Sequence, residues 1–224
     1  VCISMDVVPG WTPVGFDCMN ERGLAMIHAN VPAAPTPYDP DKPQFRHNFL
    51  EKIVSECANV KQAVAMIQAY SLPAQHRAFI HIMMVDATGE SAVVEWVDGG
   101  LRVIRREGNA QFMTNHLLSK PETAGGPKSR YARGAQMVPT LEATPQGMVA
   151  LLKEVSQGAI WKGQEVGTLH SNIWDVQARK LYLYYKRDFD HPRVISLDEE
   201  LAKGPHSIEL NSLFPNPVPF ETQW

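Results

Sequence analysis

The segment Phe79–Arg105, FIHIMMVDATGESAVVEWVDGGLRVIR, decides the fold class of this chain. It contains apolar, β-branched runs separated by the turn sequences Asp86–Gly89 (DATG) and Asp98–Gly100 (DGG). Short turns rich in Asp and Gly between such runs are typical of β-hairpins, so the segment predicts consecutive antiparallel strands. A further strand is expected over Gln111–Thr114, and it would complete a four-stranded meander.

The chain before this segment predicts more strands. Apolar runs at Val1–Val8 and Val14–Met19 read as strands, and Asn20–Gly23 (NERG) reads as a hairpin turn into a strand over Leu24–Asn30. The Pro-rich stretch Val31–Pro43 has too many prolines for regular structure and is expected to be a surface loop.

Helices are expected in two places, one on each side of the meander. Apolar residues recur at helical spacing over Phe45–Cys57, and Asn59 with Gln62 predicts a capped second helix through Ile67. Later helices are expected over Pro127–Val138 and from Thr144–Pro145 to Val155, then a hairpin over Thr168–Lys186 and an irregular end that includes residues 205–224. This order predicts an α+β fold in which antiparallel sheets pack face to face with helical layers outside.

Composition restricts the classes of function. A chain of 224 residues with 44% hydrophobic and 20% charged side chains is long enough for one large domain, and we expect residues 1–224 to form one. The formal net charge of −3 and the lack of a basic run argue against nucleic acid or an anionic membrane as partner. The three cysteines have no metal-ligand spacing, so neither a disulfide framework nor a zinc site is expected, and no cofactor signature is found.

Two asparagines are the candidate functional residues of the strands. Asn115 follows the expected strand Gln111–Thr114, and Asn30 ends an earlier strand in the same way. Polar side chains at strand ends are well placed to meet a ligand, although an asparagine there also serves as a turn former or cap. His76 and His81 flank a strand start and are interpreted as structural or surface residues rather than metal ligands.

Several segments together resemble one enzyme family. In chain order they are Gly15–Met26, with its N-E-R-G-L-A core, Val85–Glu95, Thr114–His116, Ser129–Arg133 and Ser171–Asp175 with Leu181–Tyr182. Their order and spacing are similar to those of the N-terminal-nucleophile (Ntn) hydrolases of the choloylglycine hydrolase and penicillin acyltransferase type. The resemblance covers about Pro9 to Tyr185 and is nearest to the acyltransferase branch.

The resemblance implies a four-layer αββα fold and a chemistry. In such enzymes a cysteine exposed by autoproteolytic cleavage attacks a linear amide, and its own α-amino group acts as the base. That role is physically reasonable because an α-amine titrates near neutrality. Carried over to this chain, the resemblance implies that Asn115 and Asn30 hold the oxyanion and that Arg130 supports the charge or orients polar groups. For Arg130 a surface ion pair is the alternative.

The nucleophile is the point where the chain departs from the family pattern. The family carries its cysteine some tens of residues before the N-E-x-G-L segment, whereas only a short strand precedes it here. We therefore expect the nucleophile in an upstream segment, with Cys2, after loss of Val1, as the tentative alternative. Cys2 as a small buried residue is a third interpretation.

Three functions follow as hypotheses. The first is hydrolysis of a linear, non-peptide amide of an acylated small molecule. The second is transfer of the acyl group to another amine. The third is binding without catalysis. The expected partners are this small-molecule substrate, a cleaved N-terminal segment and further copies of the chain as a homo-oligomer.

Overall fold

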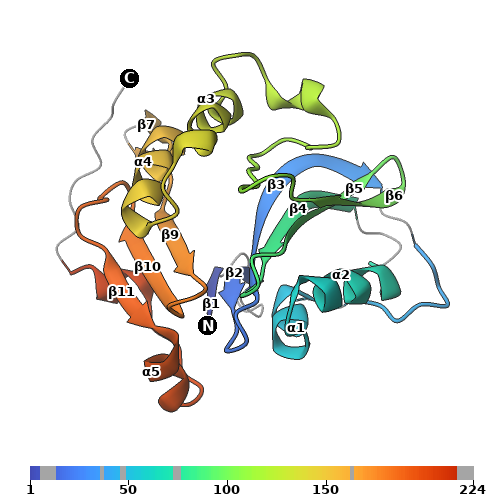
Figure 1. Cartoon of the computed structure of the whole chain (residues 1–224), viewed down its shortest axis with the longest axis horizontal. Coiled ribbons are helices and arrows are strands. Elements are labelled where there is room, and N and C mark those ends of the chain that lie inside the picture. The colour runs from blue at the N-terminus through green and yellow to red at the C-terminus, as the bar shows by residue number, and fades with distance from the viewer. Residues whose placement is uncertain (6–13, 36–37, 46–48, 73–76, 162–163, 216–224) are drawn as a thin grey trace. The chain divides into compact units, whose positions relative to one another are not determined.

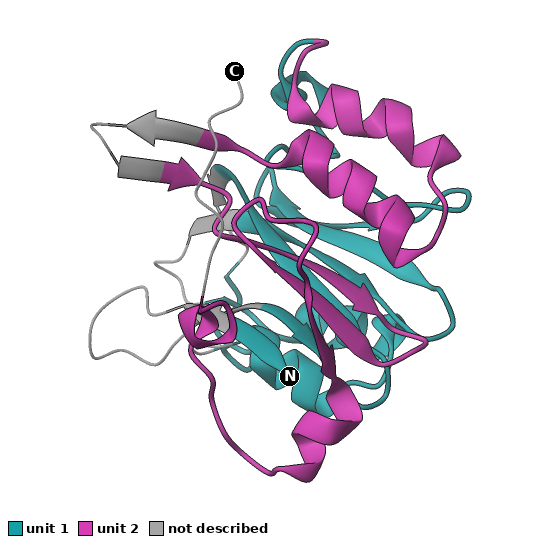
Figure 2. Ribbon diagram, turned by 90° about the vertical axis from the view of Figure 1, so that its left-hand side faces the viewer, with its two compact units in different colours: residues 1–126 teal, residues 127–224 magenta. Residues whose placement is uncertain are grey.

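The computed structural model describes residues 1–5, 14–35, 38–45, 49–72, 77–161 and 164–215 (Figure 1). Within them the chain forms two compact units, Val1–Gly126 and Pro127–Trp224 (Figure 2). The combination of antiparallel sheets and helices in both units agrees with the α+β composition predicted from the sequence. Among the described residues, no helix has the length and apolar character needed to cross a membrane.

The first unit is built on a six-stranded sheet with the simple order β1-β2-β3-β4-β5-β6. Every pair of neighbours in it is antiparallel, as expected for strands joined by short turns. The strands are β1 (Cys2–Met5), β2 (Val14–Met19), β3 (Ala25–Pro35), β4 (Arg77–Val85), β5 (Ser91–Val97) and β6 (Gly100–Arg105).

Two helices pack on one face of this sheet, α1 (Phe49–Glu56) and α2 (Val60–Ala69) (Figure 1). The predicted cap of α2 is confirmed, because the Asn59 side chain accepts from the Gln62 amide while Gln62 accepts from the amide of Ala58. The core between the helices and the sheet is formed by buried residues that include Leu50, Ile53, Val60, Val64, Ile67, Met26, Ile82, Met84 and Val94.

Strand β5, which lies between β4 and the edge strand β6, is buried along its whole length. Because side chains alternate along a strand, Ala92, Val94 and Trp96 join the core under the helices, whereas Glu95 points to the opposite face. His81 is the direct cross-strand partner of Glu95 in β4. The sheet therefore carries a buried polar pair on the face away from α1 and α2.

The expected surface loop over Val31–Pro43 is only partly correct. Strand β3 continues through Pro35, and of the remaining residues the described ones, 38–43, belong to no strand. The prolines are accommodated because the pairing with β4 is irregular there: the partners run from Asn30↔Ile80 to Ala34↔Ala78, so β3 advances four residues while β4 advances two. In a bulge of this kind not every residue donates a ladder hydrogen bond, so a proline, which has no backbone N–H, is tolerated there.

The predicted fourth strand of the meander is wrong. Strands β4, β5 and β6 form as expected, but residues 111–114 have no strand pairing. Side chains hold this segment instead: Gln111 Nε2 donates to the carbonyl of Ile104 at 2.9 Å, and the Gln111 amide oxygen accepts from the hydroxyl of Ser91. The segment leading to Asn115 is thus a fixed loop rather than an edge strand.

The second unit contains a three-stranded sheet, a separate hairpin and three α-helices. The expected hairpin is confirmed as β9 (His170–Asp175) with β10 (Lys180–Tyr185). The chain after it is more regular than expected, since β11 (Arg193–Ser196) extends the sheet and leads into α5 (Leu197–Ala202). The other elements are α3 (Arg130–Met137), α4 (Pro145–Val155), β7 (Gly158–Trp161) and β8 (Gln164–Gly167).

Both expected helices of this unit begin at a side-chain cap, and the cap predicted at Thr144 is confirmed. Ser129 accepts from the Ala132 amide at the start of α3, and Thr144 accepts from the Gly147 amide at the start of α4. The helices are joined by Arg133, whose guanidinium pairs with the Glu154 carboxylate and also donates to the Glu154 carbonyl. The β7–β8 hairpin was not anticipated from the sequence.

Candidate active site

The structure brings the two candidate asparagines of the first unit together. Asn115 Nδ2 donates to the main-chain oxygen of Asn30 at 2.9 Å, although the two residues are 85 positions apart in the chain. Both are exposed, so the contact lies at the protein surface, where a ligand can reach it. Asn30 makes this contact through its backbone carbonyl and not through its side-chain amide.

The irregular pairing of β3 explains why this carbonyl accepts from a side chain. Asn30 is the last residue in register before the shift, and the shift ends at Ala34. A bulge interrupts the ladder and turns backbone groups away from their usual strand partners. The main-chain oxygen of Asn30 meets the amide of Asn115 at this interruption.

Asn115 lies in a loop that is held by the buried pair His81 and Glu95. His81 Nδ1 lies 3.0 Å from Glu95 Oε1, and His81 Nε2 lies 2.8 Å from the carbonyl oxygen of Thr114. Both side chains of the pair have no exposed surface. The interpretation of His81 as a structural histidine agrees with these contacts.

The other end of the loop is held by the same carboxylate. Glu95 Oε1 accepts from the Leu118 amide at 2.6 Å, and Oε2 accepts from the Ser119 amide at 3.0 Å. Burial alone would raise the pKa of Glu95, but hydrogen bonds from His81 and from these two amides lower it to about 2. Glu95 is therefore ionised at neutral pH.

Both ring nitrogens of His81 face oxygen atoms at hydrogen-bond distance, one on the Glu95 carboxylate and one on the Thr114 carbonyl. The two side chains form a fully buried pair. Removing one partner of such a pair is costly because the other is left buried without its hydrogen bond.

His116, the residue after Asn115, is part of the loop's buried side. Its ring is 2% exposed, and Nδ1 lies 3.1 Å from the hydroxyl of Thr114. Burial and then the electrostatic effect of His81 lower the pKa of His116, which keeps this ring neutral at pH 7. Next to it, Leu117 packs with Val31 and Val97. The loop is consequently fixed by apolar packing as well as by hydrogen bonds.

The N-E-R-G-L motif has a structural explanation. Asn20 is buried, and its Nδ2 donates to the carbonyls of Val54 and Cys57 at the end of α1, both at 2.7 Å. Its Oδ1 accepts from the amides of Arg22 and Leu24, both at 3.0 Å. Asn20 therefore joins the β2–β3 turn to α1.

The D-A-T-G-E turn of the second motif has a similar role. Asp86 is buried, and its carboxylate accepts from the first amide of α2, that of Val60, at 2.9 Å and from the Thr88 amide at 2.9 Å. Burial alone would raise the pKa of Asp86, but bonds from Thr88, Val60 and Glu90 lower it overall. The motif thus fixes the hairpin to α2.

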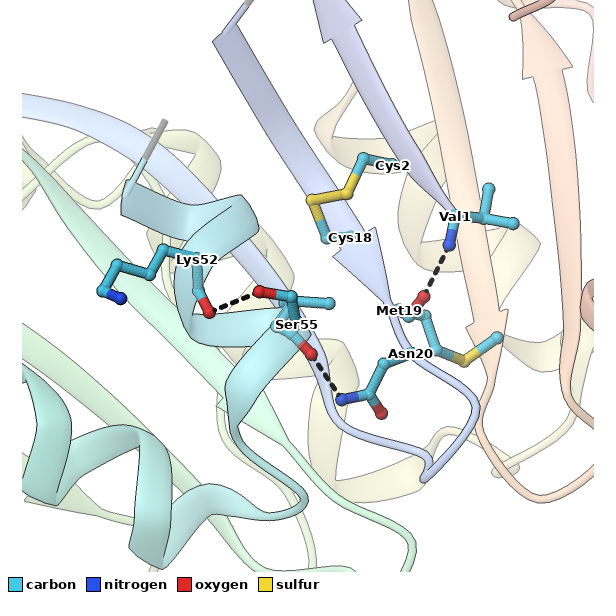
Figure 3. Close-up of a disulfide and its surroundings, with 8 residues drawn as sticks. Val1, Cys2, Cys18, Met19, Asn20, Lys52 and Ser55 are labelled. Carbon is cyan, nitrogen blue, oxygen red and sulfur yellow. Dashed lines mark hydrogen bonds between the residues drawn. A yellow bond between two sulfur atoms is a disulfide. The ribbon is translucent and has the colours of Figure 1, made fainter. Parts of the chain in front are cut away.

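Cys2 is bonded to Cys18 in a disulfide, contrary to the expectation from cysteine spacing (Figure 3). The two residues are direct partners in the β1–β2 ladder, which places them close enough to bond. The interpretation of Cys2 as a buried residue is also wrong, because it is exposed, whereas Cys18 lies fully inside the core as expected. In this state the Cys2 sulfur has no thiol that could act as a nucleophile.

Arg130, the remaining candidate residue, opens α3 in the second unit. It is half-buried, and burial followed by the neighbouring charge of Arg133 lowers its pKa. Its supporting role stays a prediction.

No metal-binding chemistry is found in the part of the chain that the structure describes: no group of His, Cys, Asp and Glu side chains is suited to hold an ion. What the first unit offers is an oriented amide donor on a rigid loop at an exposed position. Such a donor is suited to stabilise negative charge on a bound oxygen.

The fold is shared with solved structures of two kinds of enzyme. Two variants of conjugated bile acid hydrolase from Clostridium perfringens match with TM-scores of 0.65, at 16% and 17% identity, over 89% of this chain and 78% of theirs. Penicillin V acylase from Agrobacterium tumefaciens matches with a TM-score of 0.61 at 20% identity, over 81% of this chain and 65% of the acylase. The predicted Ntn-hydrolase fold of mixed α+β type is thereby confirmed.

The family follows from the sequence match. The model of the family described as acyl-coenzyme A:6-aminopenicillanic acid acyl-transferase matches residues 9–189. The chain belongs to this family, which places it broadly among amide hydrolases and acyltransferases. No curated protein gives a significant match.

Proposed function

We propose that the protein hydrolyses a linear, non-peptide amide of an acylated small molecule through an acyl-enzyme on an N-terminal cysteine. The observation that carries this proposal is the contact of Asn115 Nδ2 with the Asn30 carbonyl. It unites two positions of the family motif in one exposed place, on a loop that is rigid before substrate binds. Preorganised donors of this kind are the largest single contribution in many acyl-transfer enzymes.

The proposed reaction has two halves. The cysteine thiol gives its proton to the α-amine of the same residue, and the sulfur attacks the amide carbon to form a tetrahedral oxyanion held by Asn115. The C–N bond then breaks, the leaving amine takes the proton, and a thioester remains. Water attacks the thioester with the α-amine as base, which releases the acid and restores the thiol.

The proposed nucleophile is a cysteine encoded upstream of Val1 and exposed by cleavage. Cys2 fits this role less well because its sulfur is bonded to Cys18. Intact-mass analysis of the denatured full-length protein, with the N-terminal residue of each chain identified, tests this point. A chain that begins with cysteine is expected, and its absence from every active preparation would contradict the mechanism.

Replacement of Asn115 tests the oxyanion role. Asn115→Ala in the full-length protein is expected to lower kcat for penicillin V or a conjugated bile acid by roughly 10²–10³-fold, because one oxyanion donor is lost. The matched control is Asn109→Ala, an exposed asparagine six residues earlier whose loss should leave kcat unchanged. Circular dichroism checks that both variants are folded, and an unchanged kcat in Asn115→Ala would exclude the oxyanion role.

Acyl transfer is the second candidate, favoured by the family description, which names transfer to 6-aminopenicillanic acid. Both reactions share the thioester, so they differ only in what attacks it. With a hydrolysable substrate present, added 6-aminopenicillanic acid is expected to compete with water if the protein is a transferase. A product ratio that does not change with this amine supports hydrolysis.

A further inference from the structure

Glu95 and His81 contact the candidate loop immediately outside its functional residue. His81 holds the carbonyl of Thr114, the residue before Asn115, and Glu95 holds the amides of Leu118 and Ser119, three and four residues after it. Glu95 and His81 can hold the loop in place through these backbone groups, without a polar contact to Asn115 itself. The loop is anchored on both sides of Asn115 by two side chains that are bonded to each other.

The pair is well built for such a role. His81 and Glu95 come from the adjacent strands β4 and β5, where they are direct partners, and both are fully buried. The residue paired with His81 on its other side is Ala29, next to Asn30. Neighbouring paired positions of β3, β4 and β5 therefore set both the position of the Asn115 amide and that of the Asn30 carbonyl, which orients it.

We propose that Glu95 and His81 are positioning residues for the reaction, and that their hydrogen-bonded pair fixes the Asn115 amide in the place where the oxyanion forms. This inference rests on the proposed function of Asn115. A misplacement of about 1 Å at such a donor can lower the rate by roughly 100-fold. The pair acts on the rate of the chemical step and leaves substrate binding nearly unchanged.

The test compares kcat and KM for penicillin V in four variants of the full-length protein. Glu95→Gln keeps the side-chain shape but removes the charge and one of the two acceptor oxygens, and it is expected to lower kcat by roughly 10–100-fold with KM changed less than about 3-fold. Glu90→Gln is the matched control in the same hairpin, since Glu90 is half-exposed and pairs only with Arg105 among the described ion pairs. It should leave kcat unchanged.

Two replacements of His81 separate positioning from packing. His81→Gln retains a donor that can reach the Thr114 carbonyl, whereas His81→Leu fills the space without one. We expect His81→Gln to retain at least about 10-fold more of the wild-type kcat than His81→Leu. Equal losses in the two variants would indicate a purely structural role. If Glu95→Gln fails to fold, this comparison carries the test, because it leaves Glu95 and its backbone contacts in place.

A spectroscopic measurement distinguishes failure of this inference from failure of the proposed function. The side-chain NH₂ signals of Asn115 in a ¹⁵N–¹H spectrum should move toward the positions of free asparagine in Glu95→Gln and His81→Leu, and not in Glu90→Gln. If Asn115→Ala abolishes turnover while both variants keep kcat and these signals, the positioning role is wrong. If Asn115→Ala keeps turnover, or if the wild-type protein does not act on penicillin V, the proposed function is wrong. In that case the NMR signals of Asn115 alone decide whether Glu95 and His81 orient its side-chain amide.

Discussion

At the scale of single residues, the side-chain amide of Asn20 makes four hydrogen bonds. Its amide donates to two carbonyls at the end of α1 and accepts from two amides of its own turn. Gly23, the last residue of the Asn20–Gly23 turn, has a positive φ of 81°, a conformation that glycine adopts without strain. A motif that resembles a catalytic signature therefore encodes a joint between the sheet and a helix.

Asn20→Ala is expected to destabilise the protein by about 3 kcal/mol, because it leaves buried carbonyls and amides without partners. Asn59→Ala provides the comparison, since it removes only the cap of α2 and should cost about 1 kcal/mol. Urea unfolding of the two variants beside wild type measures the difference. A loss in Asn20→Ala no larger than that in Asn59→Ala would contradict the joint role.

At the scale of elements, strand β1 is joined to the sheet by the Cys2–Cys18 disulfide as well as by its backbone ladder with β2. The bond closes a loop with a sequence separation of 16 residues. Loops of about this size give roughly 3 kcal/mol of stabilisation by restricting the unfolded chain. The edge of the six-stranded sheet is thereby fixed covalently.

Cys2→Ser removes this link at an exposed position and is expected to lower the free energy of unfolding by about 2–3 kcal/mol. The wild-type protein in dithiothreitol should lose the same amount, while Cys2→Ser should be insensitive to the reductant. Chemical unfolding with and without dithiothreitol measures all four states. A reductant effect of equal size in Cys2→Ser would show that the disulfide is not its cause.

Elements defined by local chemistry could be predicted from the sequence. The caps at Asn59 and Thr144 and the hairpins with short turns depend on neighbouring residues, and the structure has them at the expected places. Elements that depend on distant partners could not. The segment before Asn115 resembled a strand by composition, but it lies beside β6 without entering the ladder, and β3 runs through its prolines because β4 supports the bulge.

The candidate site also combines features that the sequence predicts with features that depend on distant partners. The positions of Asn30 and Asn115 at strand ends and the family resemblance both predict them as site residues, but their mutual contact depends on the fold of β3. The pair His81 and Glu95 was missed, although a signal existed. The turn at Asp86–Gly89 sets Val85 opposite Ser91, and counting outward from it places His81 opposite Glu95. An ionisable pair at matched positions of two apolar strands indicates a buried interaction.

At the scale of the whole molecule, the buried titratable groups set the response to acid. The pKa values of Glu95 and Asp86 are lowered by hydrogen bonds, and that of His116 is lowered by burial. In each case the unfolded state binds a proton at a higher pH than the folded state does, so stability falls with falling pH. The contribution of His116 is lost as the pH falls below 6.5, the ordinary pKa of a histidine, and that of Glu95 is lost between the ordinary glutamate pKa of 4.5 and about 2.

The free energy of unfolding is therefore expected to decrease from pH 7 to pH 3, with Glu95 supplying roughly 2 kcal/mol of the change in that range. Glu95→Gln is less stable at pH 7 but should show a shallower decrease below pH 4.5, the ordinary pKa of a glutamate. Guanidinium unfolding at a series of pH values gives both curves. Parallel curves for wild type and Glu95→Gln would contradict the assigned pKa shift.

The disulfide also leaves the molecule with one natural probe of local opening, the free thiol of Cys57. With Cys2 and Cys18 bonded, Cys57 is the free thiol, buried just beyond the last turn of α1, and burial raises its pKa. A thiol reagent can label it only when that end of the helix opens, since the thiolate is the reactive form. The labelling rate of the unmodified protein thus reports how often the junction between α1, the Asn20 turn and the sheet comes apart, without any engineered probe.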